Sequence, residues 1–158
     1  MQSMSTVKLK LGRETDTIAG FLLWQVSKLW HHRLARALQD VGLPPTQAVL
    51  LANVLRFSEE GTDVTQALLS KATKVDRMTT SEALRSLEGK KLVTRRPSAA
   101  DGRTHRIQLT RRGRDVAFKT VARLAAAHEA FFLPLQSERP QIVSFLQQLI
   151  RGNDVADL

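Results

Sequence analysis

Residues 101–113, with the sequence DGRTHRIQLTRRG, combine a turn, an alternating run and four arginines within thirteen positions. Asp101 and Gly102 are typical turn residues, and the run HRIQL at 105–109 has the alternation of a half-exposed strand. Residues 92–96 form a comparable short run upstream, and the eight residues 97–104 connect the two runs. The pattern predicts a β-hairpin with its tip at 101–103 and with arginine along its strands.

Two helices are expected directly before this hairpin. Residues 65–72 have the composition of a short helix and residues 75–89 that of a longer one, so only Thr73 and Lys74 connect them. Such a short connection indicates a helix-turn-helix unit. The second helix has an expected inward stripe formed by Val75, Met78, Ala83, Leu84 and Leu87. Four polar side chains fall largely off this stripe and are expected to face outward, namely Arg77, Thr79, Ser81 and Arg85.

Further helices are expected on both sides of this unit. Residues 14–40 carry apolar side chains at three- and four-residue steps, which predicts an amphipathic helix about 40 Å long that Gly42 terminates. Residues 45–57 are strongly apolar and indicate a buried core helix. Thr110 is the expected N-cap of a helix to about residue 130, Pro134 ends it, and residues 138–152 form the last helix. The apolar stretches FFLPL (131–135) and IVSFLQQLI (142–150) exceed what one small lobe can cover, which favours an oligomer.

The positive charge of the chain is concentrated in one block. The net charge is +9, and residues 71–114 hold 13 of the 24 Lys and Arg but only 4 of the 15 Asp and Glu. The rest of the chain is therefore neutral, with eleven residues of each sign. A local excess of this kind creates a positive potential suited to a polyanion. Nucleic acid is the favoured partner over an anionic membrane surface, because the block has no long basic helix with bulky apolar anchors.

The composition excludes several classes of protein. The chain has no Cys, so disulfides, thiol redox switches and thiolate metal sites are absent. No apolar run approaches the roughly 18 residues of a membrane span, and residues 1–10 lack the apolar stretch of a secretory signal, so we expect a single-domain cytoplasmic protein. There is no phosphate-binding loop, dinucleotide-binding fingerprint or hydrolase motif, so we expect neither an enzyme nor a cofactor.

Helix, turn, helix and an arginine-rich hairpin follow each other in the order of a winged helix-turn-helix. A helix fits the width of the DNA major groove, and a hairpin tip beside it reaches phosphates or the neighbouring minor groove. Arginine suits such a tip because a narrow minor groove concentrates negative potential. The expected fold is therefore mainly α, with a two-stranded wing.

Residues 43–113, and above all 87–113 (LEGKKLVTRRPSAADGRTHRIQLTRRG), resemble the MarR (multiple antibiotic resistance regulator) family of bacterial transcription factors. The matching pattern is a helix ending in Leu-Glu, a Leu-Val-x-Arg strand, a wing with Asp-x-Arg, and an apolar residue before Leu-Thr-x-x-Gly. The residues that carry it are Leu87, Glu88, Leu92, Val93, Arg95, Asp101, Arg103, Ile107, Leu109, Thr110 and Gly113. These motifs cover about half of the chain, and the flanking helices agree with the family in order and length.

The resemblance implies an obligate homodimer that binds a pseudo-palindrome in double-stranded DNA. Within one domain of residues 1–158, it assigns residues 44–112 to the winged helix-turn-helix lobe and residues 8–42 and 113–158 to long N- and C-terminal dimerisation helices. It also implies that Arg103 enters the minor groove and that Asp101 pairs with a nearby arginine such as Arg96. The expected DNA-binding set is Arg77, Thr79, Ser81, Arg85, Arg95, Arg96, Asp101 and Arg103.

The sequence departs from the family pattern at the recognition helix and at the turn into the wing. Lys91 stands where the family usually has a glycine before Leu-Val. The Thr-Arg pair common on the recognition helix is replaced by Ser81 and Glu82. An acid at this place repels phosphate or accepts a hydrogen bond from cytosine N4. Base specificity therefore does not transfer from relatives.

Trp30, His31, His32 and Arg36 cluster on the first long helix, and two interpretations remain open for them. In one, Trp30 is a core residue and the histidines belong to the dimer surface. In the other, which the resemblance implies, Trp30, His31 and Arg36 bind a small aromatic or carboxylate effector. Consecutive histidines lie about 100° apart on a helix and cannot share a metal as an i, i+4 pair does, so no metal site is expected.

The expected function is a dimeric transcriptional regulator, a repressor that a small ligand releases from its operator. Two alternatives remain: a winged-helix protein that binds nucleic acid without sequence preference, and an adaptor that uses its basic block on an acidic partner. A steep salt dependence with little sequence preference indicates the first alternative, and a lack of discrimination between duplex DNA and other polyanions indicates the second.

Overall fold

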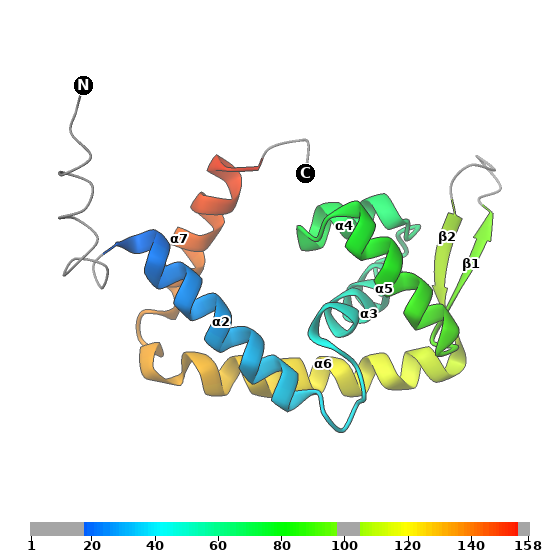
Figure 1. Cartoon of the computed structure of the whole chain (residues 1–158), viewed down its shortest axis with the longest axis horizontal. Coiled ribbons are helices and arrows are strands. Elements are labelled where there is room, and N and C mark those ends of the chain that lie inside the picture. Colours follow the sequence, from blue (N-terminus) through cyan, green and yellow to red (C-terminus); the bar gives the residue numbers. More distant parts are fainter. Residues whose placement is uncertain (1–17, 98–104, 155–158) are drawn as a thin grey trace, which may run out of the picture.

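The computed structural model describes residues 18–97 and 105–154, and these form a mainly helical chain with one antiparallel hairpin. The elements are α2 (Ala19–Ala37), α3 (Pro45–Glu59), α4 (Gln66–Thr73), α5 (Arg77–Gly89), β1 (Val93–Pro97), β2 (His105–Leu109), α6 (Arg111–Phe132), the 3-10 helix η2 (Leu133–Leu135) and α7 (Arg139–Gly152). α6 extends along the molecule from the hairpin to the region where α2 and α7 lie (Figure 1). The winged helix-turn-helix fold is thereby confirmed.

The boundaries of the expected helices differ from the structure by a few residues at most within its described part. α2 ends at Ala37 and a turn leads to Gly42, whose φ of +70° favours glycine. The expected start of this helix at residue 14 lies outside the described residues. Pro45 begins α3 at the position where its missing N–H is harmless, and Pro134 interrupts the last helices within η2.

Most of the hydrophobic core lies in the lobe, in which α3, α4, α5 and the hairpin pack on the first half of α6, and Leu34, Leu38 and Ala127 extend it toward α2. α3 is at its centre, with Ala48, Leu50, Leu51 and Val54 fully buried. The side chains packed around it come from every other element of the lobe, among them Leu69, Leu84, Leu87, Val93, Ile107 and Ala117. This core covers the inner face of the helix-turn-helix and leaves its outer face to solvent.

The hairpin joins the helix-turn-helix through its second strand. β1 and β2 pair in antiparallel register, with Arg95 opposite Ile107 and Arg96 opposite Arg106. The amide of Ile107 also donates a hydrogen bond of 2.8 Å to the carbonyl of Val64, just before α4. The wing is therefore fixed to the lobe at its base.

The start of α6 packs against the chain that enters the hairpin. The hydroxyl of Thr110 caps α6 by accepting a hydrogen bond of 2.8 Å from the amide of Gly113, and it donates to the carbonyl of Lys91 at 2.8 Å. A Cβ atom at Gly113 would lie 1.7 Å from the carbonyl oxygen of Leu92. Only glycine fits this contact, which gives the Leu-Thr-x-x-Gly pattern its physical reason.

Lys91 adopts a left-handed conformation with φ +57° directly before β1. This conformation favours glycine, because a Cβ atom approaches the following carbonyl. The turn into the wing therefore has the backbone that a glycine prefers, although the sequence places lysine there.

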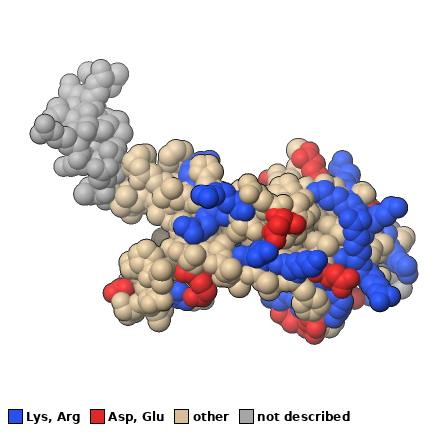
Figure 2. Space-filling view, turned by 90° about the horizontal axis from the view of Figure 1, so that it is seen from below, with Lys and Arg blue, Asp and Glu red and all other residues tan. Residues whose placement is uncertain are grey.

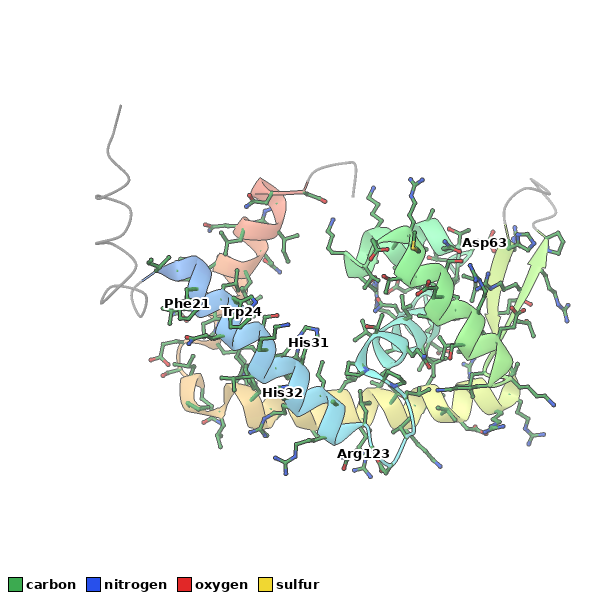
Figure 3. The ribbon with its side chains drawn as sticks, viewed as in Figure 1. Phe21, Trp24, His31, His32, Asp63 and Arg123 are labelled. Carbon is green, nitrogen blue, oxygen red and sulfur yellow. The ribbon has the colours of Figure 1, made fainter. Side chains whose placement is uncertain are left out.

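α2 and α7, which we call the arms, have little cover. α2 buries Leu34 alone among its residues, and no residue of α7 is buried. The exposed apolar side chains of the arms are Phe21, Leu22, Leu23, Trp24, Val26 and Leu29 on α2 and Val143, Phe145, Leu146, Leu149 and Ile150 on α7. Phe21 and Trp24 stack with ring centroids 6.1 Å apart on the part of α2 farthest from the wing (Figure 3). None of the helices in the described ranges is long and apolar enough to cross a membrane.

Candidate nucleic-acid interface

The turn between α4 and α5 is held by side-chain hydroxyls. The hydroxyl of Ser70 donates to the carbonyl of Val75 at 2.6 Å, and that of Thr80 donates to the same carbonyl at 3.2 Å. Lys74, with φ +57°, ends α4 in a left-handed conformation. These contacts fix the angle at which α5 leaves the turn.

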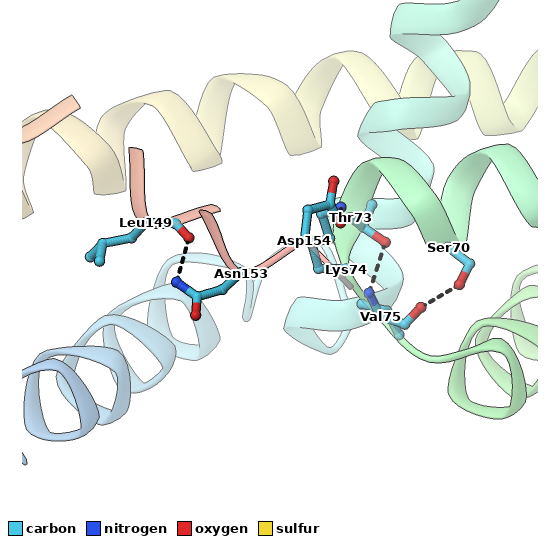
Figure 4. A network of polar contacts seen from close by, with 7 residues as sticks. All are labelled: Ser70, Thr73, Lys74, Val75, Leu149, Asn153 and Asp154. Carbon is cyan, nitrogen blue, oxygen red and sulfur yellow. Dashed lines mark hydrogen bonds and ion pairs between the residues drawn. The ribbon is translucent and has the colours of Figure 1, made fainter. Parts of the chain in front are cut away.

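The C-terminal end of α7 reaches this turn. Asp154 forms an ion pair with Lys74, and the amide of Asn153 donates to the carbonyl of Leu149 at the end of α7 (Figure 4). The contact is exposed, with 39% and 46% of the two side chains accessible. Nothing in the sequence pattern indicated it, because the two residues are 80 positions apart.

α5 begins at Arg77, two residues later than the sequence indicated, because Asp76 is its N-cap. The Asp76 carboxylate accepts a hydrogen bond of 2.8 Å from the amide of Thr79. This hydrogen bond is the main reason why the pKa of Asp76 lies below its ordinary value. The charged cap also interacts favourably with the N-terminal end of the helix dipole.

The predicted inward stripe of α5 is wrong at one position. Met78 was expected in the core, yet it is 74% exposed. Thr80 is fully buried on the inner face, beside Ala83, Leu84 and Leu87. A threonine fits there because its hydroxyl has a partner in the carbonyl of Val75, so its burial leaves no polar group unsatisfied.

The outer face of α5 agrees with the sequence expectation. Arg77, Thr79 and Arg85 are exposed, and Ser81 is half-buried. The guanidinium of Arg85 donates to the hydroxyl of Ser81 at 3.3 Å, which orders both side chains on this face. Glu82 is exposed next to them.

The arginines of the wing differ in direction. Arg95 turns inward: its side chain is only 19% exposed, its Nη2 donates to the carbonyl of Ser81 at 3.1 Å, and its Nε lies 3.6 Å from Glu88. Arg106 pairs with Asp63 at 2.7 Å. Arg96 is exposed. Arg95 therefore joins the wing to α5 in this structure, whereas the sequence placed it among the DNA contacts.

Two members of the predicted DNA-binding set, Asp101 and Arg103, lie outside the described residues. The described part of the charged block still gathers on one end of the molecule. Figure 2 shows Lys and Arg over the end that carries the wing. The start of α6 contributes Arg111, Arg112 and Arg114, all exposed, to this region.

The three predicted effector residues are not brought together. Trp30 lines a cavity of about 630 Å³ between α2, α3 and α6, together with residues such as Val49, Arg56 and His128. Arg36 lines a different cavity of about 980 Å³ between α2 and α6, with His32, Arg33 and Arg123. His31 borders neither, and its Nδ1 lies 2.7 Å from the carbonyl oxygen of Ser27. Figure 3 places both histidines along the second half of α2.

An aromatic cluster surrounds Trp30 that sequence reasoning missed. Its ring centroid lies 5.1 Å from that of Phe131 and 6.5 Å from that of His128, and His128 lies 4.8 Å from Phe132. These residues are about 100 positions away from Trp30 in the sequence, so local periodicity gives no signal for the contact. Within the described ranges no group of His, Asp or Glu side chains is arranged to hold a metal ion.

Comparison with known proteins agrees with this fold. Residues 41–104 match the model of the MarR family. The chain is 29% identical over 136 residues to YdcH of Bacillus subtilis (strain 168), an uncharacterized HTH-type transcriptional regulator, with 86% of this chain and 92% of that protein covered.

Solved structures show the same similarity. The structure of CouR from Rhodococcus jostii RHA1 bound to p-coumaroyl-CoA is 26% identical with a TM-score of 0.74, covering 87% of this chain and 95% of that chain. Bordetella bronchiseptica BpsR, whose DNA binding is regulated by 6-hydroxynicotinic acid, is 25% identical with a TM-score of 0.74, covering 83% and 91%. With its winged helix-turn-helix, its matching motifs and these relatives, the chain is similar to transcriptional regulators of the MarR family.

Proposed function

We propose that the chain is a homodimeric repressor that binds a pseudo-palindromic operator in double-stranded DNA and leaves it when a small ligand binds. The observation that carries this proposal is the outer face of α5. It is rigidly held by the turn at Val75 and by Arg95, it presents Arg77, Thr79 and Arg85 to solvent, and it lies beside a basic wing. A helix held in this way is suited to the major groove.

The proposed DNA contacts divide by position. Arg77, Thr79, Ser81 and Arg85 of α5 face the base edges and the adjoining phosphates, and Arg96 of the wing faces the backbone. From the sequence resemblance, Arg103 enters the minor groove and Asp101 shapes the wing. Arg95 has a positioning role, because its contacts with Ser81 and Glu88 hold α5 against the wing.

The proposed dimer uses the arms. The exposed apolar faces of α2 and α7 are the surfaces that a second copy of the chain covers, with residues 8–42 and 113–158 as dimerisation helices and residues 44–112 as the DNA-binding lobe. Exposed apolar faces of this extent are typical of protein interfaces. A two-fold axis between the arms places two copies of α5 about one helical turn of DNA apart.

The proposed effector site is the cavity beside Trp30. Its walls come from α2 and α6, which belong to the dimerisation helices, and from α3 of the lobe, so an occupant is able to change the angle between the two parts. Trp30 and His128 offer aromatic faces. Arg56 pairs with Glu60 at 3.1 Å at an exposed position, and a ligand carboxylate would compete with Glu60 for its guanidinium. BpsR and CouR bind or respond to ligands with aromatic rings, which supports an aromatic acid or thioester as effector. Arg36 and His31 lie elsewhere on α2, outside this cavity, and are proposed to contact the ligand only if it is long enough to reach them.

The first test is binding of the purified chain to DNA from its own upstream region and to a scrambled duplex at about 150 mM salt. A preference of ~10³ or more is expected for the native duplex. Arg103→Ala should weaken this binding by about tenfold or more, whereas Lys119→Ala, which removes a charge from an exposed position of α6, should leave it nearly unchanged.

Two results contradict the proposal. Equal, steeply salt-dependent binding to both duplexes indicates a nucleic-acid-binding protein without sequence preference. Equal binding to duplex DNA and to an unrelated polyanion such as heparin indicates an adaptor for acidic partners.

The effector is tested on the protein–DNA complex with 6-hydroxynicotinic acid and p-coumaroyl-CoA as probes. We expect at least one aromatic acid or thioester to release the DNA and to change the emission of Trp30. Trp30→Phe should keep the release, because a ring remains, and Arg56→Gln should weaken it. Release that is unaffected by substitution of Arg56 and His128 contradicts this location of the site.

A further inference from the structure

Met78 is exposed in a place where burial was expected. Among the described residues between 43 and 112, it is the one large hydrophobic side chain that is exposed, with 74% of its surface accessible. All other large exposed apolar side chains of the described ranges belong to α2 and its N-cap Ile18 or follow residue 112. The explanation that applies to the arms, cover by a second arm, therefore does not extend to Met78.

The geometry of α5 places Met78 at the centre of the outer face. A residue advances about 100° around an α-helix, so Met78 lies roughly 180° from the middle of the buried face formed by Thr80, Ala83, Leu84 and Leu87. Ser81, Glu82 and Arg85 lie within roughly 60° of it, and Arg77 and Thr79 flank it at about 100° on either side. Met78 is also the second residue of the helix, in the turn that Asp76 caps.

The surroundings of Met78 indicate the chemistry of its partner. It lies among polar and charged side chains, with Arg77 beside it and Arg85 two turns along, on the lobe that carries the excess of positive charge. An apolar protein surface is a poor match for such surroundings, whereas a polyanion with an apolar group on it is a good one. In the DNA major groove, thymine provides that group, its C5-methyl.

We propose that Met78 contacts the C5-methyl group of a thymine in each half-site and that this contact is a determinant of operator sequence. The inference rests on the proposed DNA-binding function and specifies which base feature it reads. Residues in the first turn of a recognition helix are those that meet base edges. A flexible, polarisable thioether packs well against a methyl group and excludes water from it.

The test uses duplexes that the purified full chain selects from a random-sequence pool. Each thymine of a selected half-site is replaced in turn by uracil, which removes the methyl group and leaves the base pairing unchanged. With the wild-type chain we expect one thymine in each half-site whose replacement weakens binding by about fourfold, the effect of losing one buried methyl group. Replacing the symmetry-related thymines together should weaken a dimer by about fifteenfold.

Variants of Met78 connect this loss to the side chain. Met78→Ala and Met78→Gln should bind the thymine duplex more weakly and should no longer distinguish it from the uracil duplex, whereas Met78→Leu should keep most of the discrimination. Arg85→Ala is the matched control on the same face: it should weaken binding to both duplexes and keep the methyl effect. Because Met78 is exposed, these variants should fold as the wild type does, which circular dichroism checks.

Three outcomes overturn the inference, and they are distinguishable. If the wild type prefers its selected duplex over a scrambled one but no uracil replacement weakens binding, Met78 reads no methyl group and the DNA-binding function stands. If a methyl effect is found and Met78→Ala retains it in full, another residue reads the methyl group. If the wild type shows no preference for any duplex, the proposed function fails together with the inference.

Discussion

The lobe of this chain buries most of its apolar side chains, whereas the arms leave most of theirs exposed. In the lobe, α3 buries six of its residues, and the elements around it complete a core that closes within one chain. In the arms, α2 buries one residue and α7 none, although both carry apolar faces. An amphipathic pattern therefore indicates only that a face needs to be covered. Whether the chain itself supplies that cover depends on the tertiary structure.

The largest effect is expected where the lobe is packed backbone against backbone. Gly113→Ala introduces a Cβ atom 1.7 Å from the carbonyl oxygen of Leu92, a distance that no rotamer relieves. We expect it to lower the free energy of unfolding by about 3 kcal/mol or more. Gly20→Ala on α2, where an added Cβ meets nothing within 4 Å, should be neutral or stabilising. Urea unfolding followed by circular dichroism compares the two, and equal midpoints would contradict the packing of α6 described above.

A charge on an arm should dissociate the dimer and leave the lobe folded. Phe145, 62% exposed on α7, belongs to the face that we assign to the second copy. Phe145→Glu should raise the dimer dissociation constant at least about 100-fold, since it places a carboxylate in an apolar interface.

Analytical sedimentation measures the change in the dimer dissociation constant. Tryptophan fluorescence reports whether the surroundings of the arms change, because both tryptophans of the chain lie on α2. Met78→Glu is the matched control, a charge on an exposed apolar residue of the lobe, and it should leave the dimer intact. A wild-type chain that sediments as a monomer would contradict the assignment of the arms.

A smaller effect is expected at the turn into the wing. Lys91 adopts φ +57°, so Lys91→Gly removes a backbone cost and should raise the free energy of unfolding by about 1 kcal/mol. Gly89→Ala, two residues earlier at the end of α5, is the control, because this glycine has ordinary helical geometry. Both variants should unfold at a higher midpoint temperature than the wild type, and the increase should be larger for Lys91→Gly than for Gly89→Ala. A lower midpoint for Lys91→Gly would mean that contacts of the lysine side chain stabilise the folded chain by more than the left-handed conformation costs.

The smallest effect concerns the cap of α5 and depends on pH. The hydrogen bond from Thr79 lowers the pKa of Asp76 below its ordinary value of 3.8, so this carboxylate stabilises the folded lobe above about pH 4 and loses its contribution as the pH falls through the lowered pKa. Asp76→Ala should therefore unfold at a lower urea concentration than the wild type at pH 7, and the difference between their urea midpoints should become smaller toward pH 3. Asp76→Asn, which keeps an acceptor, should retain most of the cap at both values. A difference between the midpoints that is independent of pH would show that ionisation of Asp76 does not contribute to the stability of the lobe.

Much of the fold was predictable because its signals are local. Thr110 caps α6 as expected, Pro134 interrupts the helices, and the strands of the wing lie within one residue of their predicted positions. Caps, prolines and alternation act over a few residues, so a short stretch of sequence contains all the information they need.

The predicted site was less complete because side-chain direction is a tertiary property. Arg95 and Arg96 are adjacent in the same basic run, but strand alternation and the neighbouring carbonyl of Ser81 turn Arg95 inward and leave Arg96 outside. Trp30 and Arg36 occupy one helix, but packing against α6 separates them into two cavities. Alternation predicts that adjacent arginines point to opposite sides, but which of them points inward depends on the contact with α5, and the division between the cavities depends on α6.

The order of the elements, their approximate ends and the basic character of the lobe were predictable from the sequence, because they follow from backbone preferences and charges that act locally. The burial of Thr80, the exposure of Met78, the contact of Gly113 with the carbonyl of Leu92 and the lack of cover on the arms became evident in the folded chain. Hydrophobicity favoured Met78 for the core. The cap at Asp76 and the hydrogen bond from Thr80 to Val75 fixed the rotation of α5 instead, and that rotation depends on how the whole lobe packs.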